Sequence, residues 1–186
     1  MIRSILLAGL VAALLVSLSS AEPPAASDWT KPVEVRYDTQ RCVAYRARLA
    51  GNLVIIQATH EPGWHTYAMD NTSRAAEKLA GRRSFAFDRP TEITMAGGLA
   101  QDGPWYQSPP KDFSQPELRW YAWGFEGQAL FVTKVRRADR RLATVAIRGQ
   151  ACAESTCKNI DVAIPLPLGG RASRPEVNLK SLIRVR

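Results

Sequence analysis

The feature that most constrains the fold is a run of strand-like segments near the start of the chain. Residues 41–50 read RCVAYRARLA and alternate with a period of two, and residues 52–60 read NLVIIQATH, which is rich in β-branched side chains. A period of two places alternate side chains on opposite faces of an extended strand. Gly51 and Asn52 supply a turn between the two segments, so the sequence predicts a β-hairpin.

Further strand-like segments follow, separated by Gly and Pro. We expect an extended segment over 62–70, a long loop over 97–117, and strands over 91–97, 118–125, 127–137, 141–151 and 160–168. Residues 72–81 form the one helical pattern, with Thr72 or Ser73 as the N-cap and Gly81 as the end. Several short strands with almost no helix predict an all-β chain folded as a β-sandwich.

The chain opens with the three parts of a secretory signal peptide. Arg3 supplies a positive start, residues 5–16 an apolar core, and residues 19–21 the small side chains before a cleavage point. The alternative is an uncleaved membrane anchor, which needs a longer apolar run of about 20 residues. We therefore expect an exported, periplasmic protein with a signal peptide over 1–21, a flexible leader over 22–32 and a single domain over 33–186.

The net charge of +8 is compatible with nucleic-acid binding. The basic residues are nevertheless scattered, for example in Arg82-Arg83 and Arg136-Arg137, and form no stripe interleaved with aromatic residues. Export also separates the protein from most nucleic acid. The sequence therefore predicts a solvated basic surface and no nucleic-acid partner.

Two of the three cysteines, Cys152 and Cys157, bracket a short connection between two predicted strands. Such a connection brings two Cα atoms within the roughly 4.4–6.8 Å that a disulfide requires. Three interpretations are open: a dithiol that exchanges with a partner, a structural disulfide, or part of a metal site completed by His60 and His65. A bridge across so short a loop constrains little of the unfolded chain, which favours exchange over stabilisation.

Motifs in a shared order resemble those of the amino-terminal periplasmic domain of DsbD, the thiol:disulfide interchange protein. The cysteine segment IRGQACAESTCK is followed by VAIPLPL, and before it come PGWHTYAMD, RPTEITM, GPWYQSPPKDF and GFEGQALFVTKV. The resemblance extends from about Val35 to Leu168, which is nearly the whole of the predicted domain.

The resemblance implies an immunoglobulin-like β-sandwich in which Cys152 and Cys157 are redox-active. Members of the family accept electrons from a membrane partner and pass them to periplasmic thioredoxin-fold proteins. No organic cofactor is needed, because the electrons are carried on the sulfur atoms. The second cysteine forms the mixed disulfide with partners, which implies Cys157 here. A cap loop shields the pair, and by position its capping residue is either Phe113 or Leu118.

The chain departs from the family pattern in three ways. The second cysteine is followed by Lys158-Asn159-Ile160 where the family has one residue and then Pro-Pro, so we expect a different partner-docking rim. Residues 72–86 correspond to an insertion relative to many members. The membrane and thioredoxin domains of DsbD are absent from this sequence, so we expect a separate membrane protein as electron donor.

Other residues are assigned supporting roles. In the family, the strand that corresponds to His65 and Tyr67 carries aromatic residues beside the cysteines, where they pack over the sulfurs or hydrogen-bond a thiolate. The alternative for both is an ordinary core or loop contact. Asp112 and Glu154 are candidate proton acceptors or simply exposed carboxylates. Cys42 is predicted to be a buried, unreactive thiol, with an intermolecular disulfide as the alternative.

Two functions from different classes remain. The first is an exported thiol–disulfide exchange module, of the protein-disulfide reductase or interchange type. It passes reducing equivalents through the Cys152/Cys157 dithiol to or from periplasmic thioredoxin-fold proteins. The second is a non-enzymatic binding sandwich of the cell envelope, whose short disulfide is purely structural.

Overall fold

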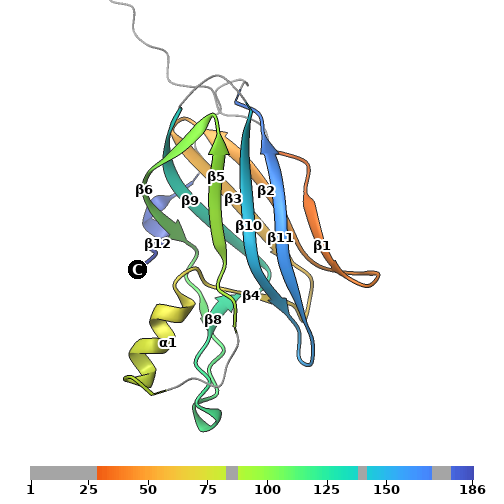
Figure 1. Ribbon diagram of the computed structural model, residues 1–186, viewed down its shortest axis with the longest axis vertical. Helices are drawn as coiled ribbons and strands as arrows, with labels where there is room; N and C mark the ends of the chain where they lie inside the picture. Colours follow the sequence, from red (N-terminus) through yellow and green to blue (C-terminus); the bar gives the residue numbers. More distant parts are fainter. Residues whose placement is uncertain (1–28, 83–87, 138–141, 169–176) are drawn as a thin grey trace, which may run out of the picture.

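The computed structural model describes residues 29–82, 88–137, 142–168 and 177–186. These residues form two antiparallel sheets packed face to face, with a short α-helix beyond one end (Figure 1). The predicted signal peptide and most of the predicted leader lie outside the described ranges. Within those ranges, no helix is long and apolar enough to cross a membrane.

The first sheet has six strands in the order β1-β2-β3-β9-β6-β12. The predicted hairpin is confirmed as β2 and β3, which pair from Val43 opposite His60 to Ala50 opposite Leu53. Thr30 in the leader donates its backbone N–H to the carbonyl oxygen of Ala47 in β2. The strands are β1 (Val33–Tyr37), β2 (Gln40–Ala50), β3 (Leu53–His60), β6 (Leu99–Gln107), β9 (Gln128–Arg137) and β12 (Ile183–Arg184).

The second sheet is built around β10, which pairs with β11 along one edge. Along its other edge β10 pairs first with β5 and then, near its end, with β4. The sheet continues from β4 through β8 to β7. The strands are β4 (His65–Tyr67), β5 (Glu92–Gly97), β7 (Lys111–Asp112), β8 (Trp123–Phe125), β10 (Ala143–Cys152) and β11 (Cys157–Leu166).

The main core lies between the two sheets and explains the alternation in the sequence. Tyr45 and Phe131 from the first sheet and Ile147 and Ile164 from the second are fully buried in one cluster. Burial of apolar surface is the dominant favourable term in folding, so residues on the inner face of each strand stabilise the sandwich. The predicted fold class, an all-β sandwich with a short helical insertion, is confirmed.

The prediction of one long loop over 97–117 is wrong, because residues 99–107 form strand β6. The turn residues Asp102, Gly103 and Pro104 fall where the register with β9 shifts, between Gln101 and Trp105. A bulge accommodates a proline because the ladder loses a hydrogen bond there in any case. The composition of this segment is therefore typical of a loop. It nevertheless forms strand β6, because it pairs with β9 on one side and with β12 on the other.

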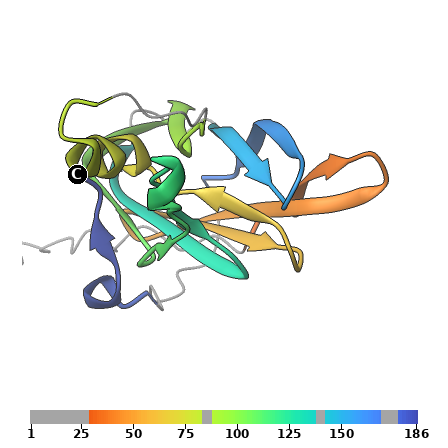
Figure 2. The ribbon, with the colours of Figure 1, turned by 90° about the horizontal axis from the view of Figure 1, so that it is seen from below.

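The predicted strand over 118–125 is also shorter than expected. Only Trp123–Phe125 is strand (β8), and Pro116–Leu118 forms the 3-10 helix η1. Arg119, with φ of 52°, turns the chain back after that helix. Helix α1 and the segment around η1 project beyond the lower end of the sandwich, which Figure 2 views end-on.

The predicted helix is confirmed as α1 (Asn71–Leu79), but both predicted caps are wrong. The N-cap is Asp70, whose carboxylate does not cap the helix; it accepts hydrogen bonds from Arg74 and Gln107. The C-cap is Ala80 in the left-handed conformation, one residue before Gly81. The buried Asp70 carboxylate thus ties the start of the helix to strand β6.

Candidate functional site

The hairpin of β10 and β11 places the two cysteines side by side. Cys152 is the last residue of β10, Cys157 is the first of β11, and the register pairs them directly. Their Cα atoms are 4.1 Å apart and their sulfurs form a disulfide. Between them, Ala153 donates its backbone N–H to the carbonyl oxygen of Thr156 at 2.8 Å, which closes the turn. Strands β10 and β11 therefore include Cys152 and Cys157, whereas the strands predicted over 141–151 and 160–168 exclude both residues.

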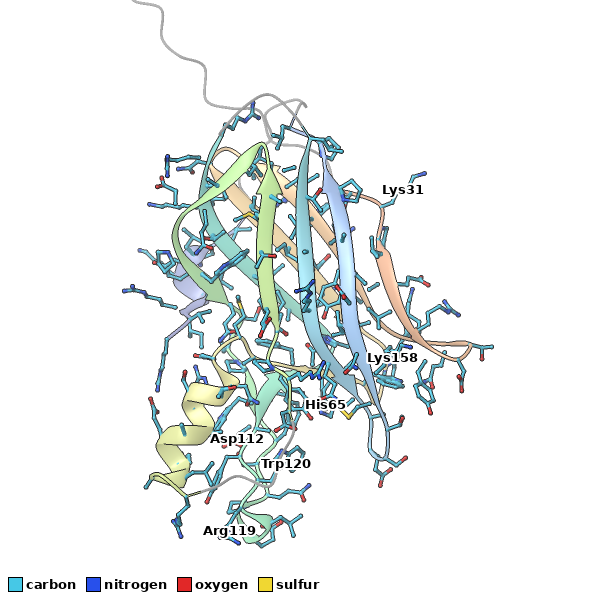
Figure 3. The ribbon with its side chains drawn as sticks, viewed as in Figure 1. Lys31, His65, Asp112, Arg119, Trp120 and Lys158 are labelled. Carbon is cyan, nitrogen blue, oxygen red and sulfur yellow. A yellow bond between two sulfur atoms is a disulfide. The ribbon has the colours of Figure 1, made fainter. Side chains whose placement is uncertain are left out.

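The other neighbour of Cys152 is β4, where His65 lies directly opposite. Cys157, Cys152 and His65 thus form a row across three adjacent strands. Side chains opposite each other in antiparallel strands share a face, with Cβ atoms about 4.5–5.5 Å apart. The adjacent residue Ala151 belongs to the main core, so the row lies on the outer face of the sheet. Figure 3 shows His65 beside the disulfide at the lower end of the sandwich.

The two bonded cysteines differ in exposure. Cys152 is only 2% exposed, whereas Cys157 and the next residue, Lys158, are exposed. An attacking thiolate needs access to the sulfur with which it will bond. Of the two bonded residues, only Cys157 is exposed.

Cys152 is buried by a hairpin over residues 113–122, which we call the cover hairpin. Its ends are joined by a backbone hydrogen bond of 2.8 Å from Phe113 to Ala122, and its middle by the pairing of Gln115 with Trp120. Ala122 is fully buried in a small apolar cluster with Cys152, against which the rings of Phe113 and Trp120 pack. The cover hairpin therefore covers Cys152 and leaves Cys157 exposed.

The structure separates the two candidate capping residues. Phe113 packs on the cluster and its ring centre lies 4.9 Å from that of His65. Leu118 lies in η1 at the tip of the hairpin, is 58% exposed, and is not brought to the cysteines. Gly124 makes room for the phenylalanine, since a Cβ at this position would lie 3.0 Å from the Phe113 ring and 2.1 Å from the Thr66 carbonyl oxygen.

Tyr67, the second supporting residue in β4, belongs to the cluster itself. It is 3% exposed, and its ring meets that of His65 edge-on with centres 5.3 Å apart. The Nε2 atom of His65 lies 3.4 Å from the Tyr67 hydroxyl oxygen. His65 and Tyr67 are therefore both brought to Cys152, as the sequence suggested for this strand.

Asp88 is a site residue that the sequence analysis missed. Its carboxylate accepts a hydrogen bond of 2.7 Å from the indole Nε1–H of Trp120 and lies close enough to Tyr67 to affect the pKa of its hydroxyl. Thr91, three residues later, fixes this segment by donating both its backbone N–H and its hydroxyl to the Tyr67 carbonyl oxygen. No motif marks Asp88, because its partners come from β4 and the cover hairpin.

Burial shifts the pKa values of these groups. It raises the pKa of Asp88, although the contacts with Trp120 and Tyr67 oppose the shift. Burial, together with the nearby Asp88 carboxylate, raises the pKa of Tyr67. Burial lowers the pKa of His65, against the attraction of Glu126 and Asp88. Tyr67 and His65 are therefore neutral near pH 7.

The remaining candidates lie outside this arrangement. Asp112 accepts a hydrogen bond from the backbone N–H of Ser114 and is exposed, and Glu154 is exposed in the turn between the cysteines. His60 is the last residue of β3 and packs against the face of β4 opposite to His65. Its Nδ1 lies 2.9 Å from the Gly127 carbonyl oxygen, and its Nε2 lies 2.8 Å from the Thr66 hydroxyl. Among the described residues, no group of three or more His, Cys, Asp or Glu side chains is arranged to hold a metal ion.

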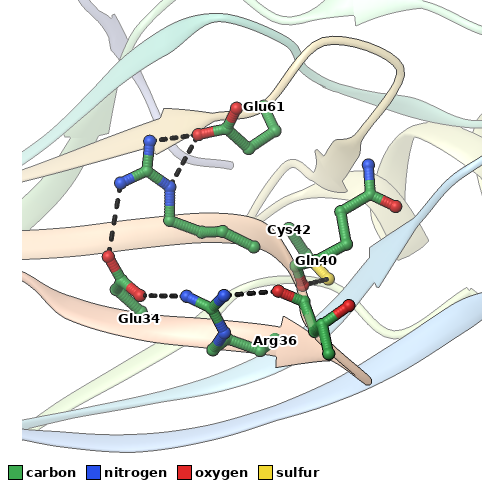
Figure 4. A network of polar contacts seen from close by, with 7 residues as sticks. Glu34, Arg36, Gln40, Cys42 and Glu61 are labelled. Carbon is green, nitrogen blue, oxygen red and sulfur yellow. Dashed lines mark hydrogen bonds and ion pairs between the residues drawn. The ribbon is translucent and has the colours of Figure 1, made fainter.

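Cys42 is a free thiol in β2 with no exposed surface. Its sulfur lies 3.9 Å from the carbonyl oxygen of Gln40, below an exposed network in which Arg41 bridges Glu34 and Glu61 (Figure 4). Burial raises the pKa of the Cys42 thiol. The predicted buried position is confirmed, and a partner could not reach this sulfur without opening the sheet.

Comparisons with known proteins give structural likenesses at low identity. No family model and no curated protein sequence matches the chain. Among solved structures, the reduced DsbD amino-terminal domain of Neisseria meningitidis is 13% identical, with a TM-score of 0.46 over 77% of this chain and 90% of that one.

Two more solved structures show similar likenesses. One is the complex of the DsbD and PilB amino-terminal domains from the same bacterium, which is 12% identical with a TM-score of 0.42 over 73% of this chain and 89% of that one. The other is the GAE domain of GGA2p from Saccharomyces cerevisiae, which is 8% identical with a TM-score of 0.38 over 75% of this chain and all of that one.

Proposed function

We propose that the protein is an exported thiol–disulfide exchange module that works through Cys152 and Cys157. The observation that carries the proposal is the unequal exposure of the two bonded residues, since Cys152 is 2% exposed and Cys157 is exposed. A partner sulfur reaches Cys157 without moving the cover hairpin. Cys152 is held next to it as the resolving thiol, protected from other reagents.

The position of the bond also favours exchange over a structural role. The two cysteines are separated by only five positions in the chain. The strands they end are already joined by ten consecutive residue pairs, from Ala143 opposite Leu166 to the cysteines themselves. A disulfide at the end of such a strand pair adds little to the stability of the fold, because the loop that it closes is small.

In the reducing direction the exchange has two steps. The Cys157 thiolate attacks one sulfur of a partner disulfide and expels the other partner sulfur as a thiolate. Cys152 then attacks the Cys157 sulfur, forms the intramolecular disulfide and releases the first partner sulfur. The partner gains two electrons and the Cys152–Cys157 pair loses them.

The class of partner follows from the sequence. The signal peptide predicts a periplasmic location, where disulfides persist and are exchanged. The motif resemblance to the DsbD amino-terminal domain points to thioredoxin-fold proteins as exchange partners and to a membrane protein as electron donor. Asn159 and Ile160 stand where that family has Pro-Pro, and of the two only Asn159 is exposed, so the partner surface is expected to meet a different rim beside Cys157.

Two measurements test the proposal. Equilibration of the purified protein in glutathione buffers should give a reduction potential between roughly −180 and −270 mV, the range of dedicated exchange proteins. The Cys152→Ala variant should retain a mixed disulfide with a thioredoxin-fold protein through Cys157, and the Cys157→Ala variant should retain far less. A potential below about −300 mV, with no trapped complex, would instead establish a structural disulfide in a binding sandwich.

A further inference from the structure

His60 and Thr66 form a buried polar contact between the two sheets. His60 is the last residue of β3 and is 5% exposed, and Thr66 is the middle residue of β4 and has no exposed surface. The Nε2 atom of His60 lies 2.8 Å from the Thr66 hydroxyl oxygen, and its Nδ1 atom lies 2.9 Å from the carbonyl oxygen of Gly127. Both nitrogens of this buried ring therefore have a hydrogen-bond partner.

The two partners determine which nitrogen of His60 carries the proton. A carbonyl oxygen is an acceptor only, so Nδ1 donates its proton to Gly127. In the neutral ring Nε2 is then an acceptor, and the Thr66 hydroxyl donates to it. A charged ring carries a proton on both nitrogens. In that state Nε2 no longer accepts, and the Thr66 hydroxyl loses its acceptor.

This contact fixes a strand that few backbone pairs hold. Strand β4 has three residues, and it pairs with β10 and with β8 over two residues each. His65 and Tyr67 face outward, where His65 lies opposite Cys152 and Tyr67 packs in the same cluster as Cys152. The Thr66 side chain points the other way, toward His60. The contact in the core thus sets the position of the two β4 residues that lie beside Cys152.

We propose that His60 is a positioning residue for the exchange site: its neutral ring accepts the Thr66 hydroxyl, holds β4 in place and keeps Cys152 covered, whereas protonation of the ring releases β4 and uncovers Cys152. This proposal rests on the proposed exchange function and adds to it a means of regulation by pH. Acid thereby opens the resolving thiol to reagents from which it is shielded at neutral pH.

The groups around the ring leave it neutral at pH 7. Titratable and charged groups lie on every element around it: Arg41 and Tyr45 in β2, Glu61 next to β3, His65 in β4 and Glu126 in the turn before β9. Arg41 and Glu61 form an ion pair, and burial raises the pKa of Tyr45, which is uncharged. Burial has the largest effect on His60 and lowers its pKa, against the attraction of Glu126 for a proton.

Burial also sets the direction of the pH dependence. The pKa of His60 is lowered while β4 is in place, and it returns toward about 6.5 when β4 opens and water reaches the ring. Below about pH 6.5 the opened form therefore binds more protons than the closed form, and the equilibrium shifts toward it as pH falls. The shift is at most about tenfold per pH unit and ends at the lowered pKa.

The test measures how often Cys152 becomes accessible, with N-ethylmaleimide as the probe. In the Cys157→Ala variant of the full chain, labelling of Cys152 and of Cys42 is counted by mass spectrometry. The range is about pH 5.5 to 8, which contains the ordinary pKa of histidine and lies above those of carboxyl groups. Each rate is divided by that of the same residue in denatured protein at the same pH, which removes the pH dependence of the thiol. Cys42 has no exposed surface and reports opening of the whole sandwich.

The pH profile identifies the titrating ring. In the Cys157→Ala protein we expect labelling of Cys152 to rise about threefold or more from about pH 7.5 to 5.5, while labelling of Cys42 stays low. His60→Gln should remove the rise, because an amide can donate and accept without becoming charged. His60 and His65 are the only 2 histidines of the chain, so His65→Gln is the matched variant, and it should keep the rise.

Thr66→Val tests the contact without changing a titratable group. It keeps the shape of the side chain and leaves Nε2 of His60 buried without a donor, so labelling of Cys152 at about pH 7.5 should rise about tenfold. Thr66→Ser keeps the hydroxyl and should retain the protection. Thr133→Val is the control and should change nothing, because Thr133 is a buried threonine of β9 whose hydroxyl donates to the Pro104 carbonyl oxygen.

Three results would overturn the proposal. They are a rise in acid that is absent from the Cys157→Ala protein or persists in His60→Gln, labelling in Thr66→Val equal to that of the parent, and equal rises for Cys152 and Cys42. The two variants are independent, so either one decides the case if the other does not fold. Failure of the exchange function looks different: it appears as a reduction potential below about −300 mV, whereas labelling of Cys152 requires no exchange partner.

Discussion

Reduction of the Cys152–Cys157 bond should leave the sandwich folded and lower its stability by a small, calculable amount. The bond joins residues five positions apart. For a closed loop of about five residues, the loop-closure relation gives an entropy near 7 cal/mol/K, or about 2 kcal/mol at 25 °C. A domain of this size loses about 2–4 °C of melting temperature per kcal/mol, so we expect a decrease of about 4–8 °C.

The structure explains why the rest of the fold is retained. The β10–β11 ladder holds the two residues opposite each other over ten pairs, and Cys152 stays packed against Tyr67 and Ala122 as a thiol. The assay is thermal unfolding by circular dichroism, with and without a phosphine reductant. The Cys157→Ser variant is the control, because it removes the bond at an exposed position and should show nearly the same decrease.

Two results would refute this reasoning. One is loss of the native spectrum on reduction at 25 °C, which would mean that the bond supports the fold as a whole. The other is a decrease in melting temperature of about 15 °C or more, about twice the largest decrease that closure of so short a loop provides.

Three further predictions concern single residues. Phe113→Ala should expose Cys152 and, in the reduced protein, speed its alkylation by iodoacetamide about tenfold, with little change in the far-ultraviolet spectrum; an unchanged rate would show that the cover hairpin does not protect this residue. Cys42 should resist iodoacetamide in the native state and react after denaturation, and Cys42→Val should cost less than about 1.5 kcal/mol and leave exchange intact. Burial alone would raise the pKa of Asp70, but hydrogen bonds from Arg74 and Gln107 outweigh it and lower that pKa. The lowered pKa stabilises the fold above the unfolded value of about 3.9, and this contribution is lost as pH falls through the folded pKa. The stability difference between wild type and Asp70→Asn should therefore shrink below about pH 4, and a constant difference would contradict the argument.

The fold class and the cysteine pair were predictable from the sequence because both depend on residues that are close in the chain. Strand formation by residues 41–50 and 52–60 follows from side-chain type and periodicity over a few positions. The opposition of Cys152 and Cys157 follows from a short turn between two strands. In each case the interacting residues are neighbours, so no knowledge of the tertiary structure is needed.

Sequence reasoning failed where a distant partner decided the outcome. Residues 99–107 contain Asp, Gly and Pro and resemble a loop, yet they form a strand because β9 and β12 offer edges to pair with. Thr72 or Ser73 was predicted as the N-cap of the helix, but the helix begins after Asp70, whose carboxylate bonds Gln107 in strand β6. Local propensity is a weak guide when long-range pairing competes with it.

The same distinction holds within the site. A short turn between two predicted strands indicated that Cys152 and Cys157 could meet, and the family resemblance made His65, Tyr67 and Phe113 candidates to lie near them. Three features could be seen only in the folded chain: Cys152 is buried and Cys157 exposed, Phe113 and not Leu118 packs against Cys152, and Asp88 accepts a hydrogen bond from Trp120. Exposure and hydrogen bonding depend on the packing of β4, β10 and the cover hairpin against one another, and periodicity within one segment carries no information about such packing.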